Sequence, residues 1–310
     1  MRFSVDPWDP DYGTSSEGSG EEASVSVELD TELPVEVWHP IRPSVPAGGH
    51  VTVIDGVRRV EARVWIDSVD GGMPGVCASW AAGALRCTNG TAELADITVG
   101  RSLAAPGPVE ALLPIETAHG IYEPVTAGDG RPEQLWLAVQ NAMGRAERRI
   151  TDQVLVDAPD GLVIVDGPLR GVEHLGQVVG LVKTHHVRYL EGAPSRILAA
   201  LGAMERTPVF TIAGGYTRHS WYARLPAPET AGVPMAGIVR CECPVGATGA
   251  ALSELADRAT VEMCRLASEP HKDRRAPQNL YPIAGLERLL RHRLGDPQLL
   301  YRSLRLAAAT

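Results

Sequence analysis

The sequence lacks the features that would assign it to several common classes of protein. It has no apolar run near the roughly 18 residues that a helix needs to cross a bilayer, which excludes a membrane-spanning helical protein. It also has no Gly-x-x-x-x-Gly-Lys-Ser/Thr loop, no Gly-x-Ser-x-Gly elbow and no His-Glu-x-x-His helix. These absences argue against P-loop nucleotide hydrolysis, α/β-hydrolase chemistry and zincin-type proteolysis.

Aromatic residues and cysteines are scarce as well. Phe, Tyr and Trp together make up 5% of the 310 residues, so Val, Leu, Ile and Ala must fill the core. The cysteines number five, which is odd, and no charged segment followed by an apolar one begins at Met1. Both observations favour a reducing compartment, and we expect a cytoplasmic protein. Cys241-Glu242-Cys243 has no partner pair at zinc spacing, so we do not expect zinc there.

Charge is unevenly distributed along the chain. Residues 1–50 hold ten acidic and two basic side chains and so contribute −8 to the net charge of −9, whereas residues 258–310 hold ten basic and five acidic ones. The overall charge therefore neither supports nor excludes a nucleic-acid partner. We expect residues 1–30 to form an acidic, disordered arm and residues 31–310 to form a single domain.

Alternation of apolar and polar residues predicts strands in the first half of the chain. The stretches lie at 50–55, 59–66, 76–88 and 92–104. Gly56-Val57 is predicted to form a short turn between the first two, and Asn89-Gly90 a hairpin turn between the last two. An antiparallel meander of three to five strands is therefore expected to open the fold.

Helical periodicity follows at 132–156, where Leu135, Val139, Met143 and Ile150 share one face and Pro132 suits a helix start. The next run, Leu162 to Asp166, is apolar on both faces and predicts a central strand covered on each side. Further strands are expected at 178–182, 208–213, 218–225 and 235–243, and helices at 194–206, 248–267, 282–294 and 297–308. The fold class predicted is α/β, with a mixed central sheet, antiparallel N-terminal strands and flanking helices.

Two strands end in the same way, because Val-Thr-Val-Ile-Asp55-Gly56 and Leu-Val-Ile-Val-Asp166-Gly167 each place an Asp after an apolar run. A carboxylate at the end of a buried strand must be paired, hydrogen-bonded or bound to a cation. Asp-Gly is also a common turn signal, so each instance alone favours a simple turn. The occurrence of two favours a shared carboxylate site.

Glu147, on the predicted helix between these strands, is a third candidate. Its ordinary interpretation is a salt-bridged helix face, because arginines flank it in Arg145-Ala146-Glu147-Arg148-Arg149. Three hard oxygen ligands would suit Mg²⁺ or Mn²⁺ with open water positions, as phosphodiester hydrolysis requires.

Lysine is nearly absent, since only Lys183 and Lys272 accompany 27 arginines among the 29 basic residues. Lys183 follows the apolar 178–182 strand, where its ammonium could reach a phosphate or a metal-bound water. Chance retention of a surface lysine is the alternative.

The order of these motifs resembles that of the NurA nucleases, which act with the HerA DNA translocase in DNA end processing. The matching pieces span about 50 to 290 and are Val-Ile-Asp55-Gly56, Glu147, Ile-Val-Asp166-Gly167-Pro-Leu, Val-Gly180-Leu-Val-Lys183-Thr, Trp-Tyr222-Ala-Arg224-Leu, Ile-Val-Arg240-Cys-Glu242-Cys-Pro and Leu-Tyr281-Pro282.

This resemblance implies an RNase H-like core with a metal-dependent nuclease site. It implies that Asp55, Glu147 and Asp166 bind Mn²⁺ or Mg²⁺ and that Tyr281 is a further site residue. It also implies a homodimer docked on a hexameric HerA-type ATPase that feeds duplex DNA toward the nuclease. Lys183 and Tyr281 are then expected to position the phosphate.

One difference from the family concerns the residues after Tyr281-Pro282. The family places a His within a turn or two of this pair, whereas Glu287 and Arg288 stand here and His292 lies further on. The segment just before the pair is basic, and its side chains Lys272, Arg274 and Arg275 are candidates for contacts with the phosphate backbone of DNA. A solvated basic loop is the alternative.

The sequence therefore predicts a metal-dependent DNA nuclease, cutting as an endonuclease or exonuclease, that works with a HerA-type ATPase. Its expected roles are DNA end resection, double-strand break repair or anti-phage defence. The alternative is a catalytically degenerate NurA-like assembly subunit of a HerA complex, which the missing His favours. An Argonaute-type nuclease would need a guide-binding portion that 310 residues barely accommodate.

Overall fold

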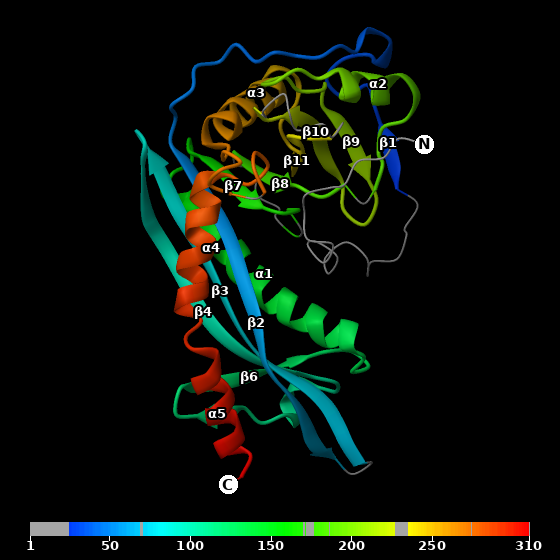
Figure 1. Cartoon of the computed structure of the whole chain (residues 1–310). Coiled ribbons are helices and arrows are strands. Elements are labelled where there is room, and N and C mark those ends of the chain that lie inside the picture. The colour runs from blue at the N-terminus through cyan, green and yellow to red at the C-terminus, as the bar shows by residue number, and fades with distance from the viewer. Residues whose placement is uncertain are drawn as a thin grey trace. The chain divides into compact units, whose positions relative to one another are not determined.

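The computed structural model describes residues 25–68, 71–169, 171, 177–185, 187–226, 235–273 and 275–309 (Figure 1). Residues 1–24 of the predicted acidic arm lie outside the described residues, and the rest of that arm contains the strand β1. The strands are β1 Ser26–Glu28, β2 Val51–Ser68, β3 Gly71–Thr88, β4 Thr91–Ala105, β5 Ile115–Thr117, β6 Gly120–Thr126, β7 Leu162–Asp166, β8 Val178–Val182, β9 Phe210–Ala213, β10 Arg218–Arg224 and β11 Ile238–Pro244.

Five α-helices belong to the described part of the chain: α1 Pro132–Asp157, α2 Gly192–Ala200, α3 Gly249–Leu266, α4 Tyr281–Arg293 and α5 Pro297–Ala307. Two short 3₁₀ turns, η1 Val35–Val37 and η2 Val109–Ala111, lie in the connections. None of these helices combines the length and the apolar character that spanning a bilayer requires.

The strands pair in the order β1-β9-β10-β11-β8-β7-β2-β3-β4-β6-β5. Among the pairs whose register the structure describes, β7 with β8 and β4 with β6 are parallel. Others are antiparallel, including β10 with its neighbours β9 and β11. The predicted α/β class with a mixed sheet and flanking helices is therefore confirmed.

The predicted turn at Gly56-Val57 is wrong, because β2 runs through it without interruption from Val51 to Ser68. The glycine serves close packing instead of a turn. A Cβ at position 56 would lie 2.9 Å from Met143 Cγ on α1 and would collide with Glu147 Oε1. Extended backbone is open to every residue, but this approach of a helix leaves room only for glycine.

The hairpin predicted at Asn89-Gly90 is confirmed. Asn89 has a φ of 50° and Gly90 a φ of 82°, which is the pair of positive angles that a tight connection between twisted strands needs. The helix expected at 194–206 is shorter than predicted, since α2 ends at Ala200 and Met204 adopts a φ of 64°.

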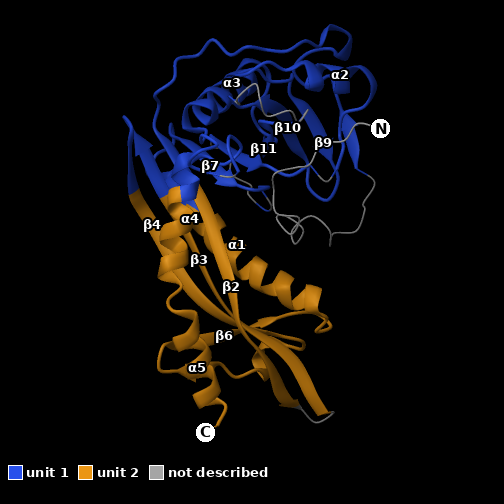
Figure 2. Ribbon diagram, viewed as in Figure 1, with its two compact units in different colours: residues 1–53, 85–93, 151–284 blue, residues 54–84, 94–150, 285–310 orange. Residues whose placement is uncertain are grey.

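The chain forms two compact units (Figure 2). Unit 1 comprises residues 1–53, 85–93 and 151–284, and unit 2 comprises residues 54–84, 94–150 and 285–310. In unit 1, a core cluster packs strands β9, β10 and β11 against the segments on either side of α2; its buried members are Trp38, Leu190, Leu201, Phe210, Ile212, Tyr222 and Ile238.

Unit 2 is built on the long strands β2 to β4, and alternate side chains of β3 face different helices. Val76 and Ala78 pack with Leu135 and Val139 of α1. Cys77, between them in sequence, packs on the opposite face with Leu304 of α5. The period of two in a strand thus places α1 on one face of this part of the sheet and the C-terminal helix on the other.

Candidate metal centre

Asp55 lies near the start of the long strand β2, with 6% of its surface exposed. Its Oδ1 accepts a hydrogen bond of 2.7 Å from the backbone N–H of Gly56. Val53 and Ile54 before it are fully buried, which explains how the apolar run carries a carboxylate into the interior. A carboxylate in this position needs compensation by hydrogen bonds or a cation.

Glu147 lies beside this segment, because its Oε1 is the nearest atom to the place where a Cβ of Gly56 would stand. It reaches there from α1, where it follows Met143 by one turn. Burial lowers the pKa of the neighbouring Arg58, and the charge of Glu147 opposes that shift. The Arg58 guanidinium also lies 5.5 Å from the centre of the Trp136 ring. Glu147 therefore lies near both the Asp55-Gly56 segment and the partly buried Arg58.

Asp166 ends β7, and the residue after it turns the chain. Gly167 has a φ of 103° and donates its N–H to Leu181 O of the neighbouring strand β8 at 2.9 Å. Gly180 of β8 makes room for this turn, because a Cβ there would lie 2.7 Å from Gly167 O. Here the Asp-Gly pair is a true strand end.

Lys183, just after β8, contacts Asp166 directly. Its Nζ lies 2.7 Å from Asp166 Oδ2 and 2.8 Å from Asn279 Oδ1, and only 3% of the lysine side chain is exposed. The interpretation of Lys183 as a surface lysine is therefore wrong. The structure brings it to a predicted metal ligand instead.

A second buried ion cluster supports the turn after Asp166. Glu242 on β11 is fully buried, and its Oε1 accepts the backbone N–H of Leu169 at 2.7 Å. Arg240 and Arg218 lie 2.6 and 3.0 Å from its Oε2. Burial alone would raise the pKa of Glu242, but the two arginines and the Tyr216 hydroxyl lower it below its usual value. An ionised Glu242 thus anchors Leu169, three residues after the end of β7.

The basic segment before α4 lies only partly within the described residues. Lys272 is 54% exposed, and its Nζ lies 4.9 Å from the centre of the Tyr281 ring at the start of α4. Arg275 is 21% exposed and lies near Asp273, with Nε 3.5 Å from Oδ1. Arg274 lies outside the described residues. Lys272 is therefore the more accessible of the two described candidates for phosphate contact.

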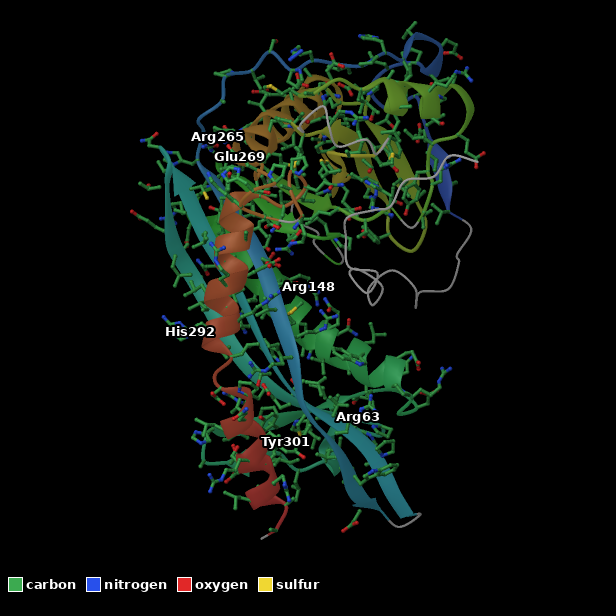
Figure 3. All side chains as sticks on the ribbon, viewed as in Figure 1. Arg63, Arg148, Arg265, Glu269, His292 and Tyr301 are labelled. Atoms are coloured by element: carbon green, nitrogen blue, oxygen red, sulfur yellow. The ribbon has the colours of Figure 1, made fainter. Side chains whose placement is uncertain are left out.

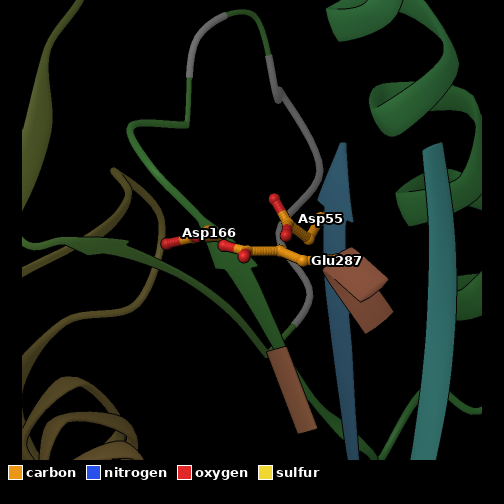
Figure 4. Close-up of side chains that lie close together, drawn as sticks. All are labelled: Asp55, Asp166 and Glu287. Atoms are coloured by element: carbon orange, nitrogen blue, oxygen red, sulfur yellow. The ribbon is translucent and has the colours of Figure 1, made fainter. Parts of the chain in front are cut away.

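Three carboxylates lie close together among the described residues (Figure 4). One ligand oxygen from each of Asp55, Asp166 and Glu287 lies within 4.8 Å of the other two. Two of these residues were predicted as ligands from the sequence, and Glu287 was not. Glu147, the third predicted ligand, is not a member of this group.

Glu287 occupies the stretch of α4 in which the NurA-like pattern would place a His. It is 8% exposed and forms an ion pair with Arg291, whose side chain is 68% exposed, with 3.7 Å between the charged atoms. A signal for its burial was present in the sequence, because it shares the apolar stripe of Ile283, Leu286 and Leu290 at helical spacing. His292, the next histidine, is exposed on α4 (Figure 3).

Carboxylate oxygens at this separation fit a hard divalent cation. Mg²⁺ and Mn²⁺ prefer oxygen ligands and are commonly held by a few carboxylates with water completing the shell. The donor set contains neither the thiolates nor the neutral imidazoles that zinc sites favour. The residues present therefore fit the class of metal that the sequence predicts.

No protein-family model matches the chain, and no curated protein matches it in sequence. Among solved structures, the chain is similar to the NurA nuclease from Sulfolobus solfataricus, with a TM-score of 0.45 and 10% identity, covering 84% of this chain and 86% of that one. It is also similar to human ENDOV, with a TM-score of 0.34 and 17% identity over 83% and 92% of the two chains. A structure of the catalytic domain of human Endonuclease V gives a TM-score of 0.33 and 15% identity over 84% and 91%. At this level of similarity, none of the three matches assigns the chain to a family.

Proposed function

We propose that this protein is a Mn²⁺- or Mg²⁺-dependent deoxyribonuclease with an RNase H-like core. The observation that carries the proposal is the group of three carboxylates, Asp55, Asp166 and Glu287, whose ligand oxygens lie within 4.8 Å of one another. Two of them come from the Asp-Gly segments that the sequence singled out, and Glu147 stands beside the first of these segments. Hydrolysis of a phosphodiester is the reaction for which such a set is suited.

In the proposed site, Asp55, Asp166 and Glu287 hold the metal and Glu147 completes the set of ligands. A divalent ion bound there would neutralise phosphate charge and lower the pKa of its bound water. Lys183 keeps Asp166 in place through Oδ2 and adds a positive charge close to the phosphate. Tyr281 and Lys272, which lie next to each other, contact the nucleic-acid backbone.

Replacing Asp55 tests this proposal, because Asp55→Asn removes one charge with almost no change in shape. Cleavage of linear and circular DNA in Mn²⁺ or Mg²⁺ should fall more than about 100-fold, since even outer partners of metal ligands cost 10- to 100-fold. Parent-like cleavage by the variant would overturn the assignment.

Asp96→Asn is the matched control. Asp96 also lies in a long strand of unit 2, and its Oδ1 accepts the N–H of the next residue at 2.7 Å, as Asp55 does. It is not one of the grouped carboxylates. Its amide variant should therefore cleave DNA like the parent.

The second candidate function is a degenerate NurA-like assembly subunit that has the fold without the chemistry. Glu287 in place of the expected His favours it. Calorimetric titration with Mn²⁺ separates the two, because a working site should bind the ion in the parent and lose that binding in Asp55→Asn. Absence of carboxylate-dependent binding in the parent would establish the second candidate over the first.

We further propose that the protein acts in the cytoplasm as a homodimer docked on a hexameric HerA-type ATPase. Its roles would then be DNA end resection, double-strand break repair or anti-phage defence. Sedimentation of the chain alone and with such an ATPase tests the assembly. A monomer that does not co-sediment with the ring would contradict it.

A further inference from the structure

A line of buried polar side chains runs behind Asp166 within unit 1. Lys183 Nζ donates to Asp166 Oδ2 at 2.7 Å and to Asn279 Oδ1 at 2.8 Å. Asn279 Nδ2 in turn donates to Asp273 Oδ2 at 2.7 Å. Asn279 is fully buried and Lys183 is 6% exposed, so the middle of this line is shielded from water. No sequence motif in the chain draws attention to Asn279 or Asp273.

Asp273, at the far end of this line from Asp166, determines the order of donors and acceptors along it. An ionised carboxylate only accepts hydrogen bonds, and an ammonium only donates them. Asp273 therefore requires the NH₂ group of Asn279 to face it, which turns the amide oxygen of Asn279 toward Lys183. Asp273 is kept ionised because the hydrogen bonds from Asn279 and Arg275 and the charge of Arg275 outweigh burial and lower its pKa.

The backbone around Asn279 leaves the residue little freedom. Its N–H donates to Arg275 O at 3.0 Å, and its C=O accepts from Ser268 N at 3.1 Å. Asp273 is likewise fixed by the N–H of Arg275, which donates to its Oδ1 at 2.8 Å. The pair is therefore a rigid support and not a mobile contact.

We propose that Asp273 and Asn279 are positioning residues that hold the Lys183 ammonium on one oxygen of Asp166. The Lys183 ammonium binds Asp166 Oδ2, which leaves a single defined oxygen of Asp166 for the proposed metal and keeps the carboxylate in one orientation. Without the support, the flexible lysine stem could leave Asp166 and the carboxylate could rotate. This inference rests on the proposed nuclease function for its catalytic consequence, and its structural part stands independently of that function.

Exchanging the two side chains provides a sharp test. In Asp273→Asn, the Arg275 N–H holds the new amide oxygen, so the new NH₂ group faces Asn279. The Asn279 amide must then reverse and point its own NH₂ group at Lys183, donor against donor. In Asn279→Asp, two carboxylates face each other across a 2.7 Å hydrogen bond. The double variant Asp273→Asn/Asn279→Asp restores a donor facing an acceptor at both contacts with the parent's net charge.

Cleavage of DNA at saturating Mn²⁺ should fall about 10- to 100-fold in each single variant, the usual cost of losing an outer partner of a metal ligand. The double variant should recover to within about 3-fold of the parent, because the two changes are coupled and not additive. Asp30→Asn is the control, since Asp30 also accepts a backbone N–H at 2.7 Å but is exposed and far along the chain. Thermal unfolding of all variants identifies any loss that is only structural.

A second measurement needs neither metal nor DNA. The chain has only two lysines, so ¹⁵N-lysine labelling gives two ammonium signals in a proton–nitrogen spectrum. The Lys183 signal should be sharp because the group is buried and hydrogen-bonded, whereas Lys272 is 54% exposed and should exchange rapidly with water. Asp273→Asn should broaden or abolish the Lys183 signal, and the double variant should restore it. If the double variant does not fold, the single variant against the parent decides the question.

The outcomes separate the two proposals. If no chain cleaves DNA but the Lys183 signal follows the exchange, the nuclease proposal fails and the positioning role stands. If the parent cleaves DNA and the double variant stays as inactive as the single ones, or the signal is unchanged in Asp273→Asn, the positioning role is overturned.

Discussion

Asp55-Gly56 on β2 and Asp166-Gly167 on β7 are nearly identical in sequence and differ in what each residue does. On β2 the strand continues for more than ten further residues and the glycine provides space for α1. On β7 the strand ends at the aspartate, and the glycine adopts a φ of 103° that only glycine tolerates well. The carboxylates also differ, because Asp55 accepts a backbone N–H and Asp166 has a buried lysine as partner.

The comparison shows that one dipeptide can deliver a carboxylate to a site by two mechanisms. On β7 the backbone geometry of glycine ends the strand, which is the ordinary meaning of Asp-Gly. On β2 the missing side chain of glycine allows helix α1 to bring Glu147 against the strand.

The largest difference is expected between Asp166→Asn and Asp55→Asn. Both should reduce cleavage more than about 100-fold if both bind metal. Asp166→Asn should in addition lower the free energy of unfolding by about 3 kcal/mol, because it removes the carboxylate charge beside the 3%-exposed Lys183 side chain. Urea unfolding at neutral pH measures this difference. Equal stability of the two variants would show that the Lys183 ion pair does not distinguish the segments.

Gly56→Ala should affect activity more than stability. A methyl group would collide with Glu147 Oε1, the far end of a flexible side chain, and would lie 2.9 Å from Met143 Cγ, so both side chains must shift. We expect a loss of about 1 to 2 kcal/mol in the free energy of unfolding, as for other overpacked sites. Cleavage should fall about 10-fold or more if Glu147 is a ligand as proposed, because the methyl group displaces its carboxylate. A variant as active as the parent would show that Glu147 plays no part.

Gly167→Ala should affect stability more than activity. Nothing lies within 4 Å of the added methyl group, so packing does not oppose the change. The φ of 103° does oppose it, at a cost of about 1 to 2 kcal/mol in the free energy of unfolding. Thermal and urea unfolding should show this cost, and Gly215→Ala, which also has open space and no positive φ, should not.

The smallest expected effect is a loss of local stability at acid pH. The pKa of Glu242, which anchors Leu169, and that of Asp273 are both lowered in the folded protein. Folding therefore favours their ionised forms, and their contribution is complete above about pH 5 and is lost as the pH falls through the folded-state values. Hydrogen exchange, corrected for intrinsic rates, should show peptides around Leu169 and Asn279 loosening between pH 6 and pH 3. Glu242→Gln should weaken this dependence, and an unchanged dependence would contradict the role of Glu242.

Local patterns predicted much of the secondary structure. The hairpin at Asn89-Gly90, the long helix α1 and the buried strands β7 and β8 follow from turn chemistry and from periods of 3.6 and 2, which depend only on neighbouring residues. This dependence on neighbouring residues alone also explains why the prediction of a turn failed at Gly56. A glycine that makes room for a helix about ninety residues later cannot be told from a turn glycine by its neighbours.

The candidate site was predictable only in part. Asp55 and Asp166 were visible because a charge interrupts an apolar run, and this is a local signal. Glu287 was missed because the apolar stripe that it shares on α4 indicates burial, whereas only the fold shows that this buried face lies beside Asp55 and Asp166. The contact of Lys183 with Asn279 joins residues 96 positions apart in the chain, and no spacing rule predicts it.

Local sequence patterns predicted most of the long strands and helices, the two carboxylates that follow apolar runs, and the near absence of lysine from a chain rich in arginine. The tertiary structure alone decided that Glu287 joins Asp55 and Asp166, that Gly56 is a packing position and that Asn279 supports Lys183. The physical reason is the distance along the chain over which each effect acts. Backbone propensity and periodicity act over a few residues, whereas ligand sets and buried hydrogen-bond lines form between residues that only folding brings together.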